Sequence, residues 1–285
     1  MEMVKARLIP LLAVAALMCA SCQYSYEYSW QKYRMDGHRT GVTAPSADNV
    51  PEALGVIDGD VYTAPNGRTF QKGSATFGAA RDMISVQPLL EDLKTVVGRA
   101  TRDMVGYAPE SDLSNWWVDN MMASVERLTK RKVDVGFLNF GGIRTSLPAG
   151  DLLLDDFVSM FPFKNYLVYV AVKGSDLQEI FNFIASSRPF VIGGAKLVVS
   201  KHQIDTLLVG GKPIDPKKTY GVATVDFLID GGDGMTVGKN AKEMIVTDKM
   251  VIDEVLARIY ELQAAGKPVE YFTDGRCVYD EWVED

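Results

Sequence analysis

The chain has 285 residues, of which 47% are hydrophobic and 24% are charged. This composition is ordinary for a soluble globular protein and leaves room for one large domain or two small ones, so disorder over most of the chain is not expected. The net charge of −7 gives no overall attraction to phosphate backbones. Nucleic acid is therefore not expected as a partner, and any anion must be held by a local cluster.

The N-terminus combines Lys5 and Arg7 with a short apolar run over residues 8–18. This order is typical of a secretory signal, and the run is too short to span a bilayer as a mature helix. Cys22 follows two small residues and resembles the lipid-acceptor cysteine of a bacterial lipobox. We expect a lipoprotein signal peptide over residues 1–21 and an exported chain anchored through Cys22 in the cell envelope, on the periplasmic side or the cell surface. The alternative is ordinary signal cleavage without lipid.

The stretch after the signal is rich in Tyr, Gly, Pro and Asn over residues 22–77. This composition predicts a tether followed by loops. An aromatic cluster near its start, over residues 24–33, either binds a partner or packs onto the domain surface. The rest of the chain, residues 78–285, is expected to form the folded domain.

Apolar residues at helical spacing predict helices over residues 88–97, 109–130 and 248–265. Ser175-Asp176-Leu177-Gln178 is typical of a capping box that begins a further helix. Strands are expected over residues 196–200 and 203–209. Helices and strands mix without the strict alternation of a doubly wound sheet, so the pattern alone indicates an α+β fold.

A buried strand over residues 133–138 is expected to end in the turn Asn139-Phe140-Gly141-Gly142-Ile143-Arg144. Gly141 and Gly142 let the backbone approach a ligand closely, and Arg144 offers a planar charged fork suited to phosphate or carboxylate. The pattern predicts an anion site. A plain glycine turn with a solvated surface arginine is the alternative.

Two further stretches accompany this turn: Phe161-Pro162-Phe163-Lys164-Asn165 before a strand, and Phe227-Leu228-Ile229-Asp230-Gly231-Gly232-Asp233-Gly234 after another. In this order and spacing, the three stretches resemble the C-terminal substrate-binding domain of the 5′-nucleotidase family. The resemblance covers residues 110–276. It implies a four-layer α/β/β/α domain that binds a nucleotide or a nucleoside.

The resemblance implies a role for each of the matching side chains. Phe163 and Phe227 resemble the two phenylalanines that sandwich the base, and Asp233 resembles the aspartate that accepts hydrogen bonds from the ribose. Stacking tolerates any base, so a broad nucleotide range is expected. Without the resemblance, core burial of both phenylalanines and a turn-forming role for Asp233 are the alternatives.

Polar positions complete the implied site. Arg144 matches an arginine that contacts the phosphate, whereas Asn139 and Asn165 match positions that hold the base or its neighbouring backbone. Gly141 and Gly142 belong to the same site, and Gly193-Gly194 is expected near its rim. The expected substrate-binding residues are therefore Asn139, Gly141, Gly142, Arg144, Phe163, Asn165, Phe227 and Asp233.

The sequence also departs from the family pattern. Lys164 replaces a glycine, Met235 replaces an aromatic residue, and Phe140 stands where a small residue is more common. The family also has one or two further arginines before the helix near Glu110, and the equivalent positions here are close to Asp103 and Tyr107, with Arg102 as the cation nearby. These departures predict a weaker phosphate clamp.

The family resemblance implies catalysis by two metal ions on a separate metallophosphatase domain, which needs several His, Asp and Asn ligands. This chain has two histidines, His38 and His202, and neither lies in a ligand-like cluster. We therefore expect no catalytic residue and no metal ligand in this chain, and a divalent metal pair on a partner phosphatase. Cys277 is expected to be a lone thiol.

Three functional hypotheses follow. The first is the substrate-recognition part of a 5′-nucleotidase, which hydrolyses nucleotide phosphomonoesters only with a separate metallophosphatase chain. The second is a surface lipoprotein that binds nucleosides or nucleotides without catalysis. The third is a domain kept as a structural or adhesion module.

Overall fold

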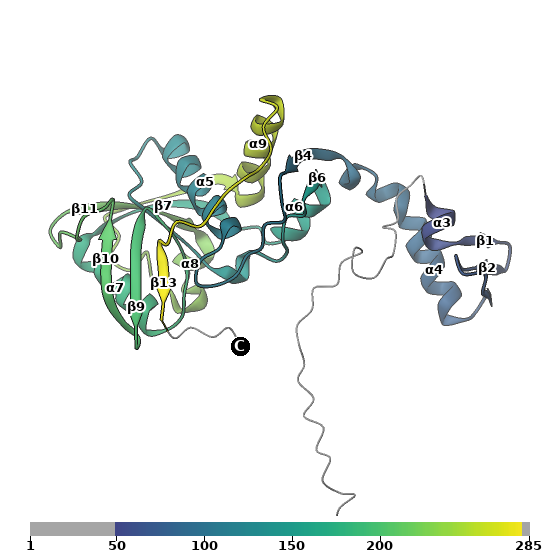
Figure 1. Cartoon of the computed structure of the whole chain (residues 1–285), viewed down its shortest axis with the longest axis horizontal. Coiled ribbons are helices and arrows are strands. Elements are labelled where there is room, and N and C mark those ends of the chain that lie inside the picture. The colour runs from purple at the N-terminus through teal and green to yellow at the C-terminus, as the bar shows by residue number, and fades with distance from the viewer. Residues whose placement is uncertain (1–48, 281–285) are drawn as a thin grey trace, which may run out of the picture.

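The computed structural model describes residues 49–280 (Figure 1). The predicted signal peptide, the lipidation site Cys22, the aromatic cluster and His38 lie outside the described residues. Within residues 49–280, no helix is both long enough and apolar enough to cross a membrane.

A small N-terminal unit precedes the main body of the protein. An antiparallel three-stranded meander packs its Tyr62 against Phe77 and Ala80 of helix α4, and these three side chains form a core of their own. The hydroxyl of Ser74 caps α4 by accepting a hydrogen bond from the backbone N–H of Phe77 at 3.2 Å. The unit consists of α3 (Val50–Leu54), β1 (Val56–Asp58), β2 (Val61–Thr63), β3 (Thr69–Gln71) and α4 (Ala75–Val86).

This unit corrects two predictions. Residues 50–77 are not a tether with loops, because short strands there pair around a shared apolar cluster. The expected boundary at residue 78 falls inside α4, whose Phe77 and Ala80 belong to the small core. The main core begins at Val97. Strands of three residues separated by turns are too short for a clear alternation, which is why composition suggested loops.

The helix expected over residues 88–97 is also wrong. The chain forms two short 3₁₀ segments, η1 (Gln87–Leu90) and η2 (Asp92–Lys94), and then strand β4 (Val96–Ala100). β4 pairs antiparallel with β6 (Gly150–Leu153), so strand pairing replaces the end of the predicted helix at Val96 and Val97, and the residues before it remain in short 3₁₀ turns.

Helix α5 (Asp112–Thr129) follows the predicted apolar stripe and buries Leu113, Trp117 and Met121. Ser111 and Ser114 form its capping box, in which the Ser111 hydroxyl accepts from the Ser114 N–H at 3.1 Å. Helix α9 (Val251–Ala264) packs beside α5. Both predicted helices are thus confirmed within a few residues.

The centre of the domain is a mixed five-stranded sheet with the order β12-β7-β11-β5-β8. β11 runs parallel to β5 and antiparallel to β7, and β8 runs antiparallel to β5. The strands are β5 (Val135–Leu138), β7 (Tyr166–Lys173), β8 (Val191–Gly193), β11 (Thr219–Val225) and β12 (Glu243–Met250).

Helices cover both faces of this sheet. On β5, the backbone of Gly136 lies so close to α5 that a Cβ there would meet Val118 at 2.8 Å. The next residue, Phe137, packs its ring 5.2 Å from that of Phe181 in α7 (Gly174–Ser186). Successive residues of a strand point to opposite faces, so α5 and α7 lie on opposite sides of the sheet.

A three-stranded sheet packs against α7. The hydroxyl of Tyr279 in this sheet donates to the carbonyl of Ile184 in α7 at 3.0 Å. Its strands are β9 (Ala195–Ser200), β10 (Gln203–Val209) and β13 (Cys277–Tyr279), in the order β10-β9-β13. The predicted hairpin over residues 196–209 and the predicted α+β class are confirmed. The capping box expected at Ser175 is wrong, because α7 begins at Gly174 and Lys173 precedes it without a side-chain cap.

Candidate functional site at one edge of the central sheet

The three predicted stretches emerge at the same edge of the five-stranded sheet. Parallel strands β5 and β11 end at Leu138 and Val225, and antiparallel β7 begins at Tyr166, so that Val225 pairs with Leu167. β8 also starts at this edge, where Val191 pairs with Leu138. We call this the loop edge. It is formed by residues 139–144, 161–165, 187–190 and 226–234.

Asp233 lies at the meeting point of three of these loops. Its Oδ2 accepts a hydrogen bond from Nδ2 of Asn139 at 2.7 Å, and its Oδ1 lies 2.5 Å from Nη2 of Arg188. The segment includes η4 (Gly232–Gly234), and Asp233 has a left-handed backbone with φ of 55°. Gly231 and Gly234 also have positive φ, which explains the glycine-rich sequence around the aspartate.

Arg188 was not predicted from the sequence. It follows α7 and precedes the first residue of β8 by three positions, in the turn Ser187-Arg188-Pro189. In the sequence, Arg188 stands out only as a charged residue beside a proline. The proximity of Arg188 to Asp233 depends on the antiparallel pairing of β8 with β5.

The predicted rim residues Gly193-Gly194 lie at the wrong end of this strand. Gly193 pairs with Gly136 near the start of β5, which is the end away from the loop edge. The prediction failed because β8 runs antiparallel to β5, and the local sequence pattern does not reveal the direction of a strand.

Phe163 and Phe227 are exposed, with 46% and 40% of their surfaces accessible. This exposure contradicts core burial, the alternative left open for both residues. The ring of Phe227, in α8 (Asp226–Ile229), lies over the backbone of Gly232, where a Cβ would come within 2.5 Å of the ring. Two aromatic side chains on the loop edge are therefore available to a ligand.

Arg144 lies beside Phe163, with its Cζ 5.9 Å from the ring centroid. Its Nη1 donates to the carbonyl of Gly141 at 3.1 Å, within the 3₁₀ turn η3 (Phe140–Gly142). A Cβ on Gly142 would lie 3.1 Å from Oδ1 of Asn139, so the second glycine leaves room for that amide. The glycine turn thus places Arg144 and Asn139 on one loop.

The segment that carries Phe163 is anchored by backbone hydrogen bonds on both sides of that residue. Helix α6 (Leu154–Met160) ends where the Met160 carbonyl accepts from the Arg144 N–H at 3.1 Å. The half-buried Asn165 accepts from the N–H of Val251 through its backbone carbonyl at 3.0 Å. Met235, which stands at an aromatic family position, is fully buried in the core.

Arg102, the cation near the positions at which further family arginines were expected, is engaged in structural contacts. Its Nη1 lies 2.7 Å from Oδ2 of Asp112, and its Cζ lies 4.9 Å from the ring centroid of Phe272. Asp103 accepts a hydrogen bond from the N–H of Ala149 at 2.6 Å. Neither residue is therefore free to act as a simple replacement for a phosphate-binding arginine.

The described residues do not fit a two-metal site. Across residues 49–280, no group of three or more His, Cys, Asp or Glu side chains could hold a metal ion. His202 lies in the tight turn between β9 and β10, where its φ is 61°. Cys277 is a buried free thiol, and burial raises its pKa to about 12.

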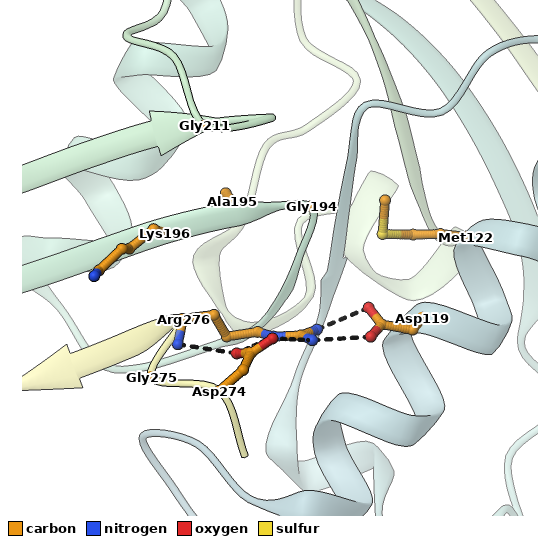
Figure 2. Close-up of a pocket in the computed structure, with 9 residues that line it drawn as sticks. All are labelled: Asp119, Met122, Gly194, Ala195, Lys196, Gly211, Asp274, Gly275 and Arg276. Atoms are coloured by element: carbon orange, nitrogen blue, oxygen red, sulfur yellow. Dashed lines mark hydrogen bonds and ion pairs between the residues drawn. The ribbon is translucent and has the colours of Figure 1, made fainter. Parts of the chain in front are cut away.

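A separate cavity of about 520 Å³ lies at the other end of the sheet and is shown in Figure 2. Arg276 dominates its wall: Nη1 and Nη2 bind both carboxylate oxygens of Asp119 at 2.7 and 2.9 Å, and Nε donates to Asp274 at 2.9 Å. Lys196 points away from these carboxylates. All three guanidinium nitrogens of Arg276 thus already donate to carboxylates, and the ion pairs tie the segment before β13 to α5.

Residues 96–240, just over half of the chain, match the protein family described as 5′-nucleotidase, C-terminal domain. The chain belongs to this family. The resemblance expected from the three sequence stretches is therefore confirmed, and all eight predicted substrate-binding residues lie within the matched region.

Known relatives share this 5′-nucleotidase C-terminal domain. Protein UshA of Yersinia enterocolitica is 30% identical over 160 residues, which cover 54% of this chain and 28% of UshA. A 5′-nucleotidase of Vibrio cholerae is 29% identical over 119 residues, which cover 40% of this chain and 21% of that protein. The chain thus spans less than a third of the length of these two relatives.

The fold is shared with a solved structure of a 5′-nucleotidase precursor from Thermus thermophilus. The two superpose with a TM-score of 0.64 at 24% sequence identity, over 75% of this chain and 46% of that one. This similarity confirms the fold predicted for the domain.

Proposed function

We propose that this chain is the nucleotide-recognition part of a 5′-nucleotidase. The observation that carries the proposal is the pair of exposed phenylalanines, Phe163 and Phe227, on the same sheet edge as Asp233. Each exposed ring offers a face on which a base can stack, and stacking on a base would cover both. The family membership of the chain supports a nucleotide as that ligand.

In this proposal, each part of a nucleoside monophosphate has a partner. The two phenylalanines stack on the base, the carboxylate of Asp233 accepts hydrogen bonds from the ribose, and the guanidinium of Arg144 contacts the phosphate. The amide of Asn139 orients Asp233 through the 2.7 Å hydrogen bond. Asn165 fixes the loop of Phe163 through its backbone.

We further propose that hydrolysis requires a metallophosphatase partner chain that supplies the divalent metal pair. A two-metal site would activate water and neutralise the leaving phosphate when present. In support of this proposal, no group of three or more His, Cys, Asp or Glu side chains within residues 49–280 is arranged to hold a metal ion. The residues of this chain would bind and orient the nucleotide only.

The test is a phosphate-release assay with AMP. The purified chain in chelator is expected to release no phosphate, and release is expected when an exported metallophosphatase from the same cell and a divalent metal are added. With the same enzyme and metal, the variant Phe227→Ala is expected to give less phosphate release than the wild-type chain. Phosphate release by the pure chain in chelator would contradict the proposal.

Capture of nucleosides without hydrolysis is the second candidate, and one observation favours it. The side chains that we propose for the base and the ribose lie on the loop edge, whereas Arg102 is held by Asp112 and Phe272. Equal affinity for adenosine and AMP, together with no phosphate release with any metallophosphatase, would support this candidate over the first.

Export and lipid anchoring belong to the same proposal. The sequence before residue 22 supports a lipoprotein signal, and Cys22 is the expected acceptor. Metabolic labelling with a radioactive fatty acid is expected to mark the full chain, and the variant Cys22→Ser should lose the label. Retention of the label by that variant would exclude Cys22 as the acceptor.

A further inference from the structure

Arg188 places a second positive charge at the ribose end of the proposed site. Its Nη2 lies 2.5 Å from Oδ1 of Asp233, and Asn139 occupies the other carboxylate oxygen at 2.7 Å. Both oxygens that a ribose diol would use as acceptors therefore already have a donor. A free diol would have to share them.

The guanidinium of Arg188 is well placed to bind a ligand. Half of the side chain is exposed, whereas the Asp233 side chain is 26% exposed. The guanidinium has five N–H donors in a fixed fork, and the ion pair engages one of its nitrogens. An ion pair with one partner this exposed is weak, so an incoming anion can compete for the arginine.

The amide of Asn139 allows Asp233 to remain in place during such an exchange. Asn139 holds Oδ2 from the loop after β5, independently of Arg188. The Arg188 guanidinium lies over the ring of Phe190, 5.8 Å from its centroid, which limits the directions in which it can move. The arginine can thus turn toward a ligand while the glycine-rich loop keeps its shape.

We propose that Arg188 determines ligand specificity by binding a phosphate ester on the ribose, so that the site takes nucleoside 3′-phosphates. A carboxylate alone beside the ribose hydroxyls selects the free diol, whereas an arginine there accommodates a ribose phosphate. The planar fork of arginine matches phosphate in a bidentate manner. This inference rests on the proposed nucleotide-binding function of the loop edge.

A purely structural role for Arg188 makes a different prediction. If the ion pair only fixes the loop around Asp233, its removal weakens every nucleoside ligand by a similar factor. If Arg188 binds a ribose phosphate, its removal weakens only the ligands that carry one. The ratio of affinities therefore distinguishes the two roles, even if the variant is less stable.

The experiment is a calorimetric titration with adenosine, 5′-AMP and adenosine 3′-phosphate, in chelator. We expect the wild-type chain to bind adenosine 3′-phosphate about tenfold more tightly than adenosine. Arg188→Gln should remove that preference and leave the affinity for adenosine equal or higher. Arg258→Gln, which changes an exposed arginine on α9, is the matched control and should keep the preference.

The possible outcomes separate this inference from the proposed function. Binding of adenosine and 5′-AMP without any preference for the 3′-phosphate would overturn the role of Arg188 and leave the proposed function intact. An equal loss for all three ligands in Arg188→Gln would assign the residue a structural role and overturn the inference. Absence of binding by all three ligands to the wild-type chain would overturn both.

Discussion

Asn139 donates a hydrogen bond from Nδ2 to Oδ2 of Asp233 over 2.7 Å, although the two residues are 94 positions apart in the chain. The bond joins the loop after β5 to the loop after β11, the two parallel neighbours in the central sheet. It fixes the carboxylate that we assign to the ribose. The amide of Asn139 thus acts on the ligand through Asp233 in addition to any direct contact.

Removal of this bond is expected to weaken nucleoside binding without unfolding the domain. The bond holds the Asp233 carboxylate in place before a ligand arrives, so in Asn139→Ala the ligand must order that side chain, and the affinity for adenosine should fall by up to about tenfold. Calorimetric titration checks the affinity, and thermal unfolding checks the fold. Asp230→Ala changes an exposed aspartate of the same segment and should leave the affinity unchanged. Equal affinity in Asn139→Ala and the wild type would contradict the assigned role.

The exposed phenylalanines give a second prediction. Loss of one stacking surface costs about 1–3 kcal/mol per base, so Phe163→Ala and Phe227→Ala should each weaken AMP binding by roughly 5-fold to 150-fold. Both side chains are exposed, so the free energy of unfolding should change little. Tyr260→Ala removes an aromatic ring that is 48% exposed on α9 and is the matched control. A large loss of stability in either phenylalanine variant, with no loss of affinity, would assign the ring to the core.

The Arg276 cluster is predicted to contribute to stability and not to ligand binding. The Arg276 side chain is 12% exposed and that of Asp119 is 30% exposed, so removing the arginine leaves a half-buried carboxylate without its bidentate partner, whereas Asp274 is 56% exposed and reaches solvent. Arg276→Met is expected to lower the free energy of unfolding by about 3 kcal/mol. Arg258→Met removes an exposed pair and should change it by less than about 0.5 kcal/mol. Urea unfolding measures both, and similar values for the two variants would contradict the prediction.

The segment before the C-terminus is predicted to make the fold sensitive to alkali. Burial raises the pKa of Cys277 from 9.0 to about 12, and burial with the hydrogen bond to Asp119 raises that of Tyr271 from 10.0 to about 12. Burial also raises the pKa of Tyr279. The unfolded chain releases these protons at lower pH than the folded chain does. The stability that these groups contribute is therefore complete below about pH 9 and is lost as the pH rises toward 12.

A cysteine variant isolates the first part of this effect. Of the three groups, the thiol of Cys277 ionises first in the unfolded chain, above about pH 9. Its ionisation there lowers the free energy of unfolding by up to about 1.4 kcal/mol per pH unit. Cys277→Ala should therefore lose less stability than the wild type over this interval in urea unfolding. The same loss in both chains would show that the thiol does not contribute.

The thiol also predicts a chemical property. Because Cys277 is buried and its pKa is raised, little thiolate is present near neutral pH, and a thiol reagent should react only after denaturation. Reaction of the native truncated chain, which starts at residue 23 and lacks Cys22, would show that the segment around Cys277 opens in solution.

The sequence was sufficient for the long, periodic elements and for the family to which the three loop stretches point. Helix α5 followed its apolar stripe. The segments containing Asn139 and Asp233 emerged at one edge because β5 and β11 are parallel, and that of Phe163 joins them because it precedes the antiparallel β7. Local spacing was insufficient where pairing with a distant strand decided the structure. This is why the end of the helix predicted over residues 88–97 belongs to β4, which pairs with β6.

The site itself also contained a residue that sequence reasoning missed. Arg188 lies 45 positions before Asp233 in numbering, and only the antiparallel direction of β8 brings it to the loop edge. The same direction moves Gly194 to the opposite end. Strand direction and sheet order are long-range properties, and a single sequence without paired partners does not contain them in its local pattern.

The most direct test of the central claim is a calorimetric titration of the chain from residue 23 with AMP and with adenosine, in chelator. The proposed function predicts that both ligands bind and that Phe227→Ala weakens both, while Tyr260→Ala weakens neither. Failure of both ligands to bind a chain that is folded by thermal unfolding would contradict the assignment of the loop edge as a nucleotide site.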